Sequence, residues 1–225
     1  EDFLREARLT ALLDHPNIMN IHEIGLDEHN HPYFTMDLKQ GDNLEVILKK
    51  KEAGDALYLE KYGLNELLDI FQKVCNAIDY AHSKAVVHLD LKPDNIQVGD
   101  FGEVLLCDWG LSKILGQKND LAVDNLLDPD VLNNMTLHGV IKGTPGYMAP
   151  EQITGEAKTQ QTDIFALGCI LYRICAGREA FRGEVEFLLK KTVKGIYTPV
   201  TELNKSLAQG LAAIVDKAMK AIPEE

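Results

Sequence analysis

The segment from residue 88 to residue 110 constrains this chain more than any other part of its sequence. It begins with the octet HLDLKPDN (88–95) and ends with the triplet DWG (108–110). Between them, two short apolar runs flank the turn-forming sequence GDFG (99–102), which predicts two antiparallel strands joined by a tight turn. The expected hairpin starts just after Asn95, so its far end brings Asp108 back to face Asn95.

Four polar side chains of this segment predict phosphoryl-transfer chemistry. Asp90 can accept a hydroxyl proton, and Lys92 can lie against a transferred phosphate. Asn95 and Asp108 offer the oxygen ligands that Mg²⁺ prefers. Because four residue types occur together at fixed offsets, we expect this segment to hold the reacting groups.

The same segment resembles the catalytic loop and the metal-binding motif of eukaryotic-type protein kinases. The metal-binding motif of that family is usually DFG, which occurs here literally at 100–102, whereas 108–110 have the sequence DWG. Asp next to Gly favours a turn, and Asp108 follows Asn95 by thirteen residues, as in the family. We therefore expect Asp100 to be a turn residue and Asp108 to be the metal-binding acid.

The order of the predicted elements resembles the protein-kinase fold over essentially all 225 residues. The expected helices and strands follow from apolar periodicity and from turn-forming residues. They are a helix at 1–14, strands at 18–24 and 33–38, helices at 44–51 and 64–84, a core helix at 164–176 opened by Thr162-Asp163, and a helix at 207–221. The GTPGYMAPE stretch (143–151) resembles the platform that docks a peptide substrate beside the reacting groups.

This resemblance implies an α+β fold whose parts have expected boundaries. Residues 1–36 would form a partial N-lobe of the αC helix and two strands, 37–41 the hinge, and 42–225 a mainly α-helical C-lobe with an activation segment at 108–151. The family's glycine-rich loop and the lysine of its third strand precede αC. We therefore expect this chain to be a fragment of a longer kinase, truncated at both ends and inactive by itself.

The resemblance also assigns the nucleotide site. Met36 would be the gatekeeper residue, and backbone groups near Asp37 and Lys39 would bind adenine. Gln97 stands where the family usually has an apolar side chain under the adenine. A buried amide without a partner costs about 1–3 kcal/mol, so Gln97 either packs through its methylenes or weakens ATP binding. The implied cofactors are ATP and Mg²⁺, with Mn²⁺ as the alternative metal.

Two further features follow from the same comparison. His88 would pack in an apolar spine against Trp109, the aromatic residue before Gly110 of the metal-binding motif. Leu89 replaces the arginine that binds the activation-loop phosphate in many kinases, and leucine cannot form a charge-assisted pair. We therefore expect activation not to depend on that contact.

Four more positions match structural residues of the family. Glu6 would be the αC glutamate that pairs with the third-strand lysine, and Thr144 would contact Asp90. Asp163 would hold the catalytic-loop backbone by hydrogen bonds, or cap its own helix, or do both. Glu151 would pair with an arginine of the late helices, which this sequence lacks, so we expect its buried carboxylate to have no partner, a destabilising arrangement.

The expected function is transfer of the γ-phosphoryl group of ATP to serine and threonine hydroxyls of proteins in signal transduction. Lys92 together with Thr144 resembles the serine/threonine class, and the sequence as a whole resembles bacterial kinases of the eukaryotic type. The main alternative is a pseudokinase or protein-binding scaffold, which the unusual Leu89, Trp109 and Gln97 would favour. The presence of all four reacting residues argues against it. A small-molecule phosphotransferase is third, since the GTPGYMAPE stretch argues for a protein substrate.

Composition limits the remaining classes of protein. A hydrophobic fraction of 45% is enough for a sizeable core, and a net charge of −12 makes nucleic acid an unexpected partner. The longest apolar run, 166–176, is too short for a membrane span and contains Arg173. The four cysteines show no CxxC pair, which indicates small buried side chains in a reducing compartment. We therefore expect a cytoplasmic protein, or the cytoplasmic part of a membrane-anchored one, of open oligomeric state.

Overall fold

The structure is a computed structural model that describes residues 9–38, 40–116 and 145–222. By its internal contacts the chain forms two compact units. Unit 1 comprises Glu1–His88 and Pro93–Ile114, and unit 2 comprises Leu89–Lys92 and Leu115–Glu225. Glu6, Lys39 and Thr144, which have predicted roles, lie outside the described residues, as does most of the predicted activation segment.

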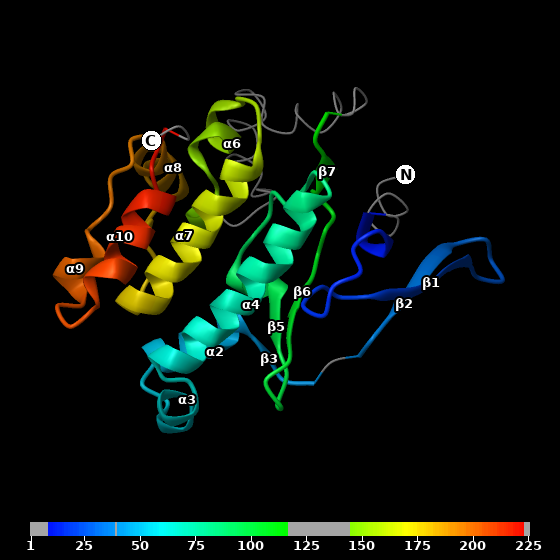
Figure 1. The fold of residues 1–225 in the computed structure, drawn as a ribbon, viewed down its shortest axis with the longest axis horizontal. Helices are drawn as coiled ribbons and strands as arrows, with labels where there is room; N and C mark the ends of the chain where they lie inside the picture. Colours follow the sequence, from blue (N-terminus) through cyan, green and yellow to red (C-terminus); the bar gives the residue numbers. More distant parts are fainter. Residues whose placement is uncertain (1–8, 39, 117–144, 223–225) are drawn as a thin grey trace. The chain divides into compact units, whose positions relative to one another are not determined.

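Unit 1 combines short strands with helices, among them the long helix α4 (Figure 1). Its described elements are β1 (Ile21–Leu26), β2 (Pro32–Met36), β3 (Asp42–Asn43), α2 (Leu44–Glu52), α3 (Ala56–Lys61), α4 (Leu64–Ser83), β4 (Val86–Val87), the 3₁₀ helix η1 (Pro93–Asn95), β5 (Ile96–Val98), β6 (Val104–Leu106) and β7 (Lys113–Ile114). The strands pair as β1-β2, β3-β5-β6 and β4-β7, in each case antiparallel.

The hairpin predicted after Asn95 is confirmed. Strand β5 pairs with β6, with Ile96 opposite Leu106 and Val98 opposite Val104. Asp100 lies in the turn between them, where Gly102 has a φ of +85° and its amide donates to the carbonyl of Gly99 at 3.2 Å. The literal DFG triplet at 100–102 is therefore a solvent-exposed turn.

The first predicted strand starts later than the sequence indicates. Residues 9–11 are helical, as predicted, but β1 begins at Ile21 instead of at residue 18. Ile18 bridges Leu106 of β6, where the amide of Leu106 donates to the Asn17 carbonyl at 2.8 Å and the amide of Met19 donates to the Leu106 carbonyl at 3.0 Å. The backbone of 17–19 thus pairs with a strand far away in sequence and not with β2.

The predicted helices at 44–51 and 64–84 are confirmed as α2 and α4. The Asn43 side chain caps α2 by accepting a hydrogen bond from the amide of Val46 at 2.9 Å. The apolar periodicity of 64–84 predicts a buried face made of Leu67, Leu68, Phe71, Val74, Cys75, Ile78 and Ala81. The observed buried face of α4 differs from it in part, because this helix packs on β4 and β6. Ile70 and Ala77 are buried there, whereas Leu68, Phe71 and Cys75 of the predicted face are only half-buried.

Unit 2 is helical among its described residues. Its elements are the 3₁₀ helix η4 (Pro145–Tyr147), α6 (Pro150–Thr154), α7 (Gln160–Ala176), α8 (Val185–Val193), α9 (Val200–Leu203) and α10 (Gln209–Ala218). The core helix α7 begins four residues before its predicted start at Ile164. Thr159 caps it by accepting from the amide of Gln161 at 3.3 Å, so Asp163 is not the N-cap.

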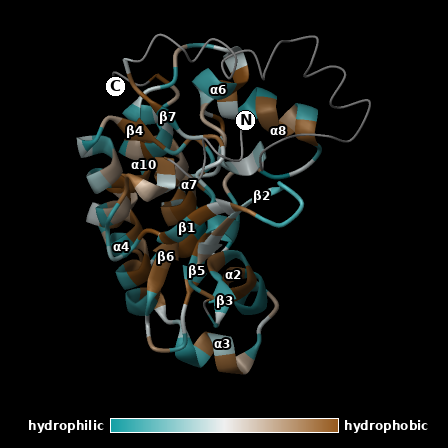
Figure 2. Cartoon of the chain, turned by 90° about the vertical axis from the view of Figure 1, so that its right-hand side faces the viewer, coloured by the Kyte–Doolittle hydropathy of each residue, from teal (hydrophilic) through white to brown (hydrophobic). Residues whose placement is uncertain are grey.

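Helix α7 is the core of unit 2, as its apolar sequence predicts. Thirteen of its residues are buried, and it contacts α9, α10 and η4. Gly168 permits the close approach to α10, because a Cβ there would lie 2.7 Å from the Met219 side chain and 2.9 Å from that of Ala218. Figure 2 shows the hydrophobic colour along α7 and β6 and the hydrophilic colour over the β1–β2 turn. Among the described helices, none has the length and apolar character needed to cross a membrane.

Gly41, between β2 and β3, is the glycine whose replacement should cost most. Its φ is +109°, and a Cβ there would lie 2.2 Å from the carbonyl oxygen of Val98. We expect Gly41→Ala to lower the free energy of unfolding by more than about 2 kcal/mol, through backbone strain and a clash with a fixed carbonyl. Equilibrium urea unfolding measures this loss.

Gly54→Ala is the matched control, since Gly54 also has a positive φ of +78°, but a Cβ there would meet no atom within 4 Å. It should lose only the strain component, about 1 kcal/mol. Equal losses of unfolding free energy in the two variants would show that the close approach of Gly41 to the Val98 carbonyl adds nothing to the cost of the substitution.

Candidate functional site

The β5–β6 hairpin places Asn95 and Asp108 at one end of unit 1. The Asn95 carbonyl accepts a hydrogen bond from the amide of Cys107 at 2.9 Å, which extends the ladder by one residue beyond the Ile96–Leu106 pair. Asp108 therefore directly follows the residue opposite Asn95. Asn95 is 7% exposed and Asp108 is exposed, so an amide oxygen and a carboxylate lie at the same end of the hairpin.

Asp108 has a backbone conformation that non-glycine residues rarely adopt. Its φ is +60°, and its Oδ1 accepts a hydrogen bond from the Gly110 amide at 3.4 Å. Leu89 in unit 2 has a φ of +67°. Such strained residues cluster at functional sites, and here two of them fall within the motifs that the sequence singled out.

His88 and Trp109 pack against one another in unit 1. Their ring centroids lie 4.6 Å apart with the planes tilted by 47°, and both side chains are essentially fully buried. His88 Nε2 lies 3.2 Å from the Cys107 carbonyl oxygen. Among the described residues the Trp109 indole N–H has no acceptor, although a buried unpaired donor costs about 1–3 kcal/mol.

Asp90 and Lys92 form a close ion pair in unit 2. Lys92 Nζ lies 2.6 Å from Asp90 Oδ2, and the two side chains are only 16% and 14% exposed. Asp90 also lines a cavity of about 10 Å³ together with Tyr147 and Met148, a volume that fits one water molecule. The carboxylate of Asp90 thus adjoins the GTPGYMAPE stretch.

Side chains from α6 and α7 hold the backbone of Leu89. The Leu89 amide donates to Asp163 Oδ1 at 2.9 Å, and the Leu89 carbonyl accepts from Gln152 Nε2 at 2.8 Å. Both backbone groups of this strained residue are therefore bonded. The sequence pointed to Asp163, but it gave no signal for Gln152, which lies 63 residues away along the chain.

Glu151 has a partner, contrary to the expectation that its carboxylate would be left without one. The Thr162 hydroxyl donates to Glu151 Oε1 at 2.6 Å, and both residues are buried. The same hydroxyl accepts from the Thr159 amide at 3.1 Å. A residue of the first turn of α7 therefore satisfies the carboxylate that the sequence assigned to a distant arginine.

Arg173, unlike the half-buried Gln152, is a fully buried residue to which the sequence assigned no role. It is 1% exposed in the middle of unit 2, and its Nη1 donates to the Tyr147 hydroxyl at 2.8 Å. The same Nη1 lies 3.5 Å from Glu179 Oε1. The signal that the sequence does carry is an arginine in an otherwise apolar helix, since a buried cation requires partners.

Metal-thiolate and cysteine-nucleophile chemistry find no support in the described part of the chain. No group of three or more His, Cys, Asp or Glu side chains gathers there in a metal-binding arrangement. Burial raises the pKa of the Cys75 and Cys107 thiols to about 11, so both are protonated at neutral pH. The polar side chains that could take part in a reaction are therefore those at the Asn95–Asp108 end of the hairpin and those in the 89–92 loop.

Comparison with known proteins shows the family to which the chain belongs. The protein kinase domain family matches residues 1–224. The chain belongs to the protein kinase family. It is similar to serine/threonine-protein kinase PknD of Chlamydia pneumoniae, with 41% identity over 176 residues, which cover 76% of this chain and 19% of that protein.

Two further relatives carry the same name. The PknD protein of Protochlamydia amoebophila is 37% identical over 96% of this chain and 23% of its own length. That of Chlamydia caviae is 34% identical over 99% of this chain and 24% of its own length. The chain therefore spans about a quarter or less of the length of these curated relatives. The expected resemblance to bacterial kinases of the eukaryotic type is confirmed.

Two of the positions that the kinase resemblance assigns to the nucleotide, Met36 and Gln97, lie on strands of unit 1, and a third, Asp37, directly follows β2. Met36 ends β2 with 46% of its surface exposed, and Asp37 Oδ1 lies 2.7 Å from His22 Nε2. Gln97, in the middle of β5, is half-buried and stands between Asn43 of β3 and Leu105 of β6. ATP and Mg²⁺ are the cofactors that the kinase family uses.

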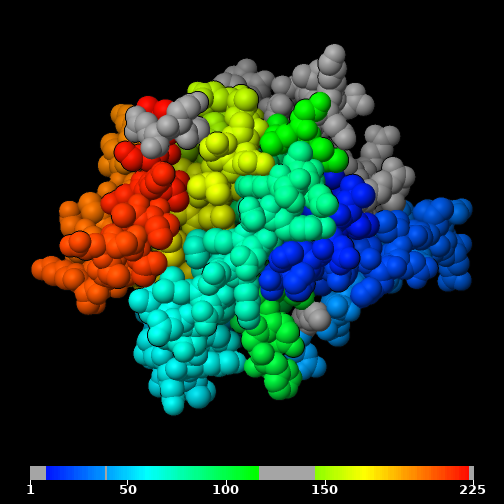
Figure 3. All heavy atoms as spheres, in the orientation of Figure 1, coloured from blue at the N-terminus to red at the C-terminus, as the bar shows by residue number. Residues whose placement is uncertain are grey.

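Unit 1 also contains a pocket of about 240 Å³ on the face shown in Figure 3. It lies among α3, the first turns of α4 and the β5–β6 turn, where Figure 3 shows a notch between the cyan and green spheres. Lys61 Nζ lies 3.6 Å from Asp100 Oδ1 at its rim, and Lys73 Nζ donates to the Gly102 carbonyl at 2.7 Å. Its lysines are thus engaged with the turn.

The bond between Arg173 and Tyr147 should contribute more to stability than an ordinary tyrosine hydrogen bond. Tyr147→Phe keeps the ring but removes one acceptor of a buried guanidinium, so we expect a loss of about 1.5–3 kcal/mol in the free energy of unfolding. Tyr172→Phe is the matched control, because its hydroxyl donates to the neutral Thr198 carbonyl at 2.7 Å. That variant should lose about 1 kcal/mol. Urea unfolding that ranks the two variants in reverse would contradict this assignment.

Proposed function

We propose that this protein transfers the γ-phosphoryl group of ATP to serine and threonine hydroxyls of protein substrates. The observation that carries the proposal is the Asp90–Lys92 pair, at 2.6 Å, beside the Tyr147–Met148 stretch. A carboxylate next to a cation suits a hydroxyl nucleophile on one side and a phosphate on the other. The adjoining 143–151 stretch supports a protein as the hydroxyl donor over a small molecule.

Asp90 would orient the substrate hydroxyl and take its proton late in a loose transition state. The neighbouring Lys92 would then neutralise charge on the transferred phosphate oxygens. General-base positioning of this kind contributes roughly 10²–10⁴-fold to the rate. Because both side chains are largely shielded from solvent, their charges are screened less than they would be on the surface.

Asn95 and Asp108 would hold Mg²⁺, with Mn²⁺ as the alternative metal. The donor set fits, because both residues provide oxygen and lie at the same end of the hairpin. With only two protein ligands, room is left for waters and phosphate oxygens, as Mg²⁺ requires. When bound, the metal ion would neutralise charge on the ATP phosphates.

The remaining assignments follow the family residue by residue. Met36, Asp37, Lys39 and Gln97 would surround the adenine, at the hinge between an N-lobe at 1–36 and a C-lobe from 42. His88, Trp109 and Gly110 would fix the metal-binding motif, Asp163 the catalytic loop, and Glu151 and Thr144 the docking stretch. Glu6 would pair with the family's third-strand lysine. The named relatives act on serine and threonine, and the supply of ATP places the proposed reaction in the cytoplasm.

The choice between the two acidic triplets gives a direct test. Asp108→Ala should abolish Mg·ATP-dependent phosphorylation of a generic protein substrate by the full-length protein, because it removes a metal ligand. Asp100→Ala removes a turn residue that pairs with the exposed Lys61, so it should leave the activity within about twofold of the wild type. The opposite ranking in a radiolabelled-phosphate assay would refute the assignment of Asp108.

Asp90→Asn tests whether the protein is an enzyme or a scaffold. We expect phosphorylation to fall by at least about 10²-fold while nucleotide binding, measured by calorimetry, is retained. A scaffold would bind its partner equally well with either residue and would show no phosphoryl transfer in the wild type. Activity in Asp90→Asn equal to that of the wild type would remove the base from the mechanism.

A further inference from the structure

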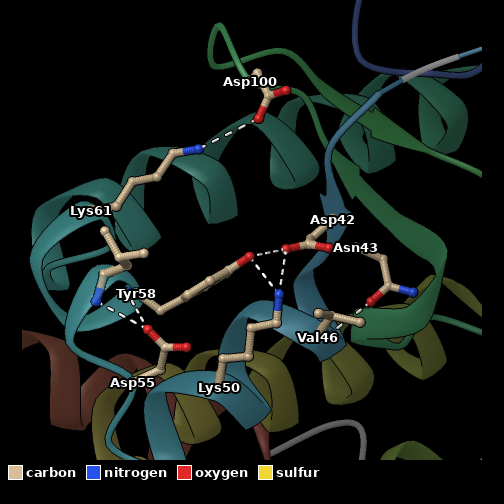
Figure 4. Close-up of polar contacts among 9 residues, drawn as sticks. Asp42, Asn43, Val46, Lys50, Asp55, Tyr58, Lys61 and Asp100 are labelled. Atoms are coloured by element: carbon tan, nitrogen blue, oxygen red, sulfur yellow. Dashed lines mark hydrogen bonds and ion pairs between the residues drawn. The ribbon is translucent and has the colours of Figure 1, made fainter.

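Three polar side chains form a closed cluster just after the hinge position. Asp42 belongs to β3, Lys50 to the last turn of α2, and Tyr58 to α3, and Figure 4 shows the three pointing toward one another. All three are half-buried. None was singled out by the catalytic motifs, and none has a role in the mechanism above.

The contacts of the cluster form a triangle. The Tyr58 hydroxyl donates a short hydrogen bond to Asp42 Oδ2. Lys50 Nζ donates to the same Oδ2 at 3.3 Å and to the Tyr58 hydroxyl oxygen at 2.6 Å. Lys50 Nζ also lies 4.2 Å from the centroid of the Tyr58 ring, within cation–π range. Each member therefore bonds both others.

The cluster keeps both of its ions charged. The Tyr58 hydroxyl, and to a lesser degree Lys50, hold the pKa of Asp42 below its usual value of 3.8. The same hydroxyl and Asp42 hold the pKa of Lys50 above its usual value of 10.5. The contribution of Asp42 is thus lost only as the pH falls below about 4, and that of Lys50 only as it rises above about 10.5.

Asp42 connects the other two residues of the cluster to β5, the strand that carries Gln97. In the β3–β5 pairing Asp42 stands opposite Val98, and Asn43 stands opposite Gln97. Gly41, immediately before, packs against the Val98 carbonyl and permits no side chain. The backbone of 41–43 is therefore fixed on one side by β5 and on the other by Lys50 and Tyr58.

The helix that supplies Tyr58 adds no side chain to the hydrophobic core of unit 1. α3 contains no buried residue, and its leucines Leu57 and Leu59 are 73% and 49% exposed. The Asp55 side chain caps it by accepting from the amide of Leu57 at 3.0 Å (Figure 4). Its connection to the rest of unit 1 through Tyr58 is thus a polar contact to Asp42 and not a part of the hydrophobic core.

We propose that Lys50 and Tyr58 are positioning residues for ATP binding. They hold Asp42 and, through it, the backbone of residues 41–43, which follows the hinge position, against β5, the strand that carries Gln97. The inference rests on the proposed function. A hinge held in place beforehand binds the adenine without first being ordered, so the cluster acts on nucleotide affinity. Neither residue needs to touch ATP, and the transfer step itself does not involve them.

The test separates nucleotide affinity from catalysis. Tyr58→Phe keeps the ring under Lys50 and removes only the hydroxyl. In the full-length protein it should raise the KM for ATP about three- to tenfold, because only part of the free energy of the lost hydrogen bonds is transmitted to the nucleotide site. The kcat and the KM for the protein substrate should stay within about twofold of the wild type. Lys50→Gln should raise the KM for ATP as Tyr58→Phe does, whereas Lys50→Arg, which keeps the positive charge, should retain most of the affinity for ATP.

Lys49→Gln is the matched control. Lys49 belongs to the same helix, carries the same charge and pairs with Glu45 at 3.1 Å, but its side chain is 69% exposed and is not a member of the cluster. This variant should leave the KM for ATP unchanged. The ratio of KM values between Tyr58→Phe and the wild type should also stay constant from about pH 6 to about pH 9, since both ions remain charged over that range.

Two outcomes would overturn the proposal. One is an unchanged KM for ATP in Tyr58→Phe. The other is a parallel fall in kcat and rise in both KM values together with a lower melting temperature, which would indicate a merely structural role. Calorimetric ATP titration of the catalytically disabled Asp90→Asn protein, with and without Tyr58→Phe, measures affinity independently of turnover. Weaker ATP binding there supports the positioning role even if no phosphoryl transfer is found, whereas a wild type that binds no ATP refutes both proposals.

Discussion

The hydrogen-bonded ladder between β5 and β6 is the constraint on which the rest of unit 1 depends. Its last bond, from the Cys107 amide to the Asn95 carbonyl, determines where Asp108 stands relative to Asn95. Along its length β6 receives residues 17–19 on one side, and β5 receives Asp42 and Asn43 on the other. A one-residue slip of this register would exchange the buried and exposed faces and separate the two oxygen donors. Short strands thus set the relative positions of Asn95 and Asp108, which lie just outside the strands themselves.

In unit 2 the main constraint is the loop that contains Leu89, which has an unfavourable backbone conformation and no regular secondary structure of its own. Leu89 has a left-handed backbone, which costs a leucine about 1–2 kcal/mol. Hydrogen bonds from its amide to Asp163 Oδ1 and from Gln152 Nε2 to its carbonyl offset that cost. Three polar residues of the otherwise apolar α7 therefore each bond another segment of unit 2. Asp163 bonds the backbone of Leu89, Thr162 bonds the Glu151 carboxylate, and Arg173 bonds the Tyr147 hydroxyl.

Local pattern was enough to predict some of this structure and not the rest. The GDFG turn and the helix at 44–51 depend on residues within a few positions of one another, and the sequence located both. The start of β1 depends on the bond between Ile18 and Leu106, which no local periodicity contains. Local periodicity also gave no sign of the roles of Gln152 and of the partner of Glu151, because each depends on a contact with another segment of the folded chain. The buried face of α4 was misjudged in part since α4 packs on two strands, and periodicity alone does not say which neighbours a helix will meet.

Trp109 is the only tryptophan of the chain, and it is buried against His88 directly after Asp108. Its emission therefore reports on the 108–110 segment alone, without a background from other indoles. An apolar environment shifts such emission to shorter wavelengths, and a neighbouring imidazole quenches it when the ring becomes protonated. The packing that fixes the motif also gives the protein a built-in optical probe, so binding and conformational change at this point can be followed in the unlabelled, unmodified chain.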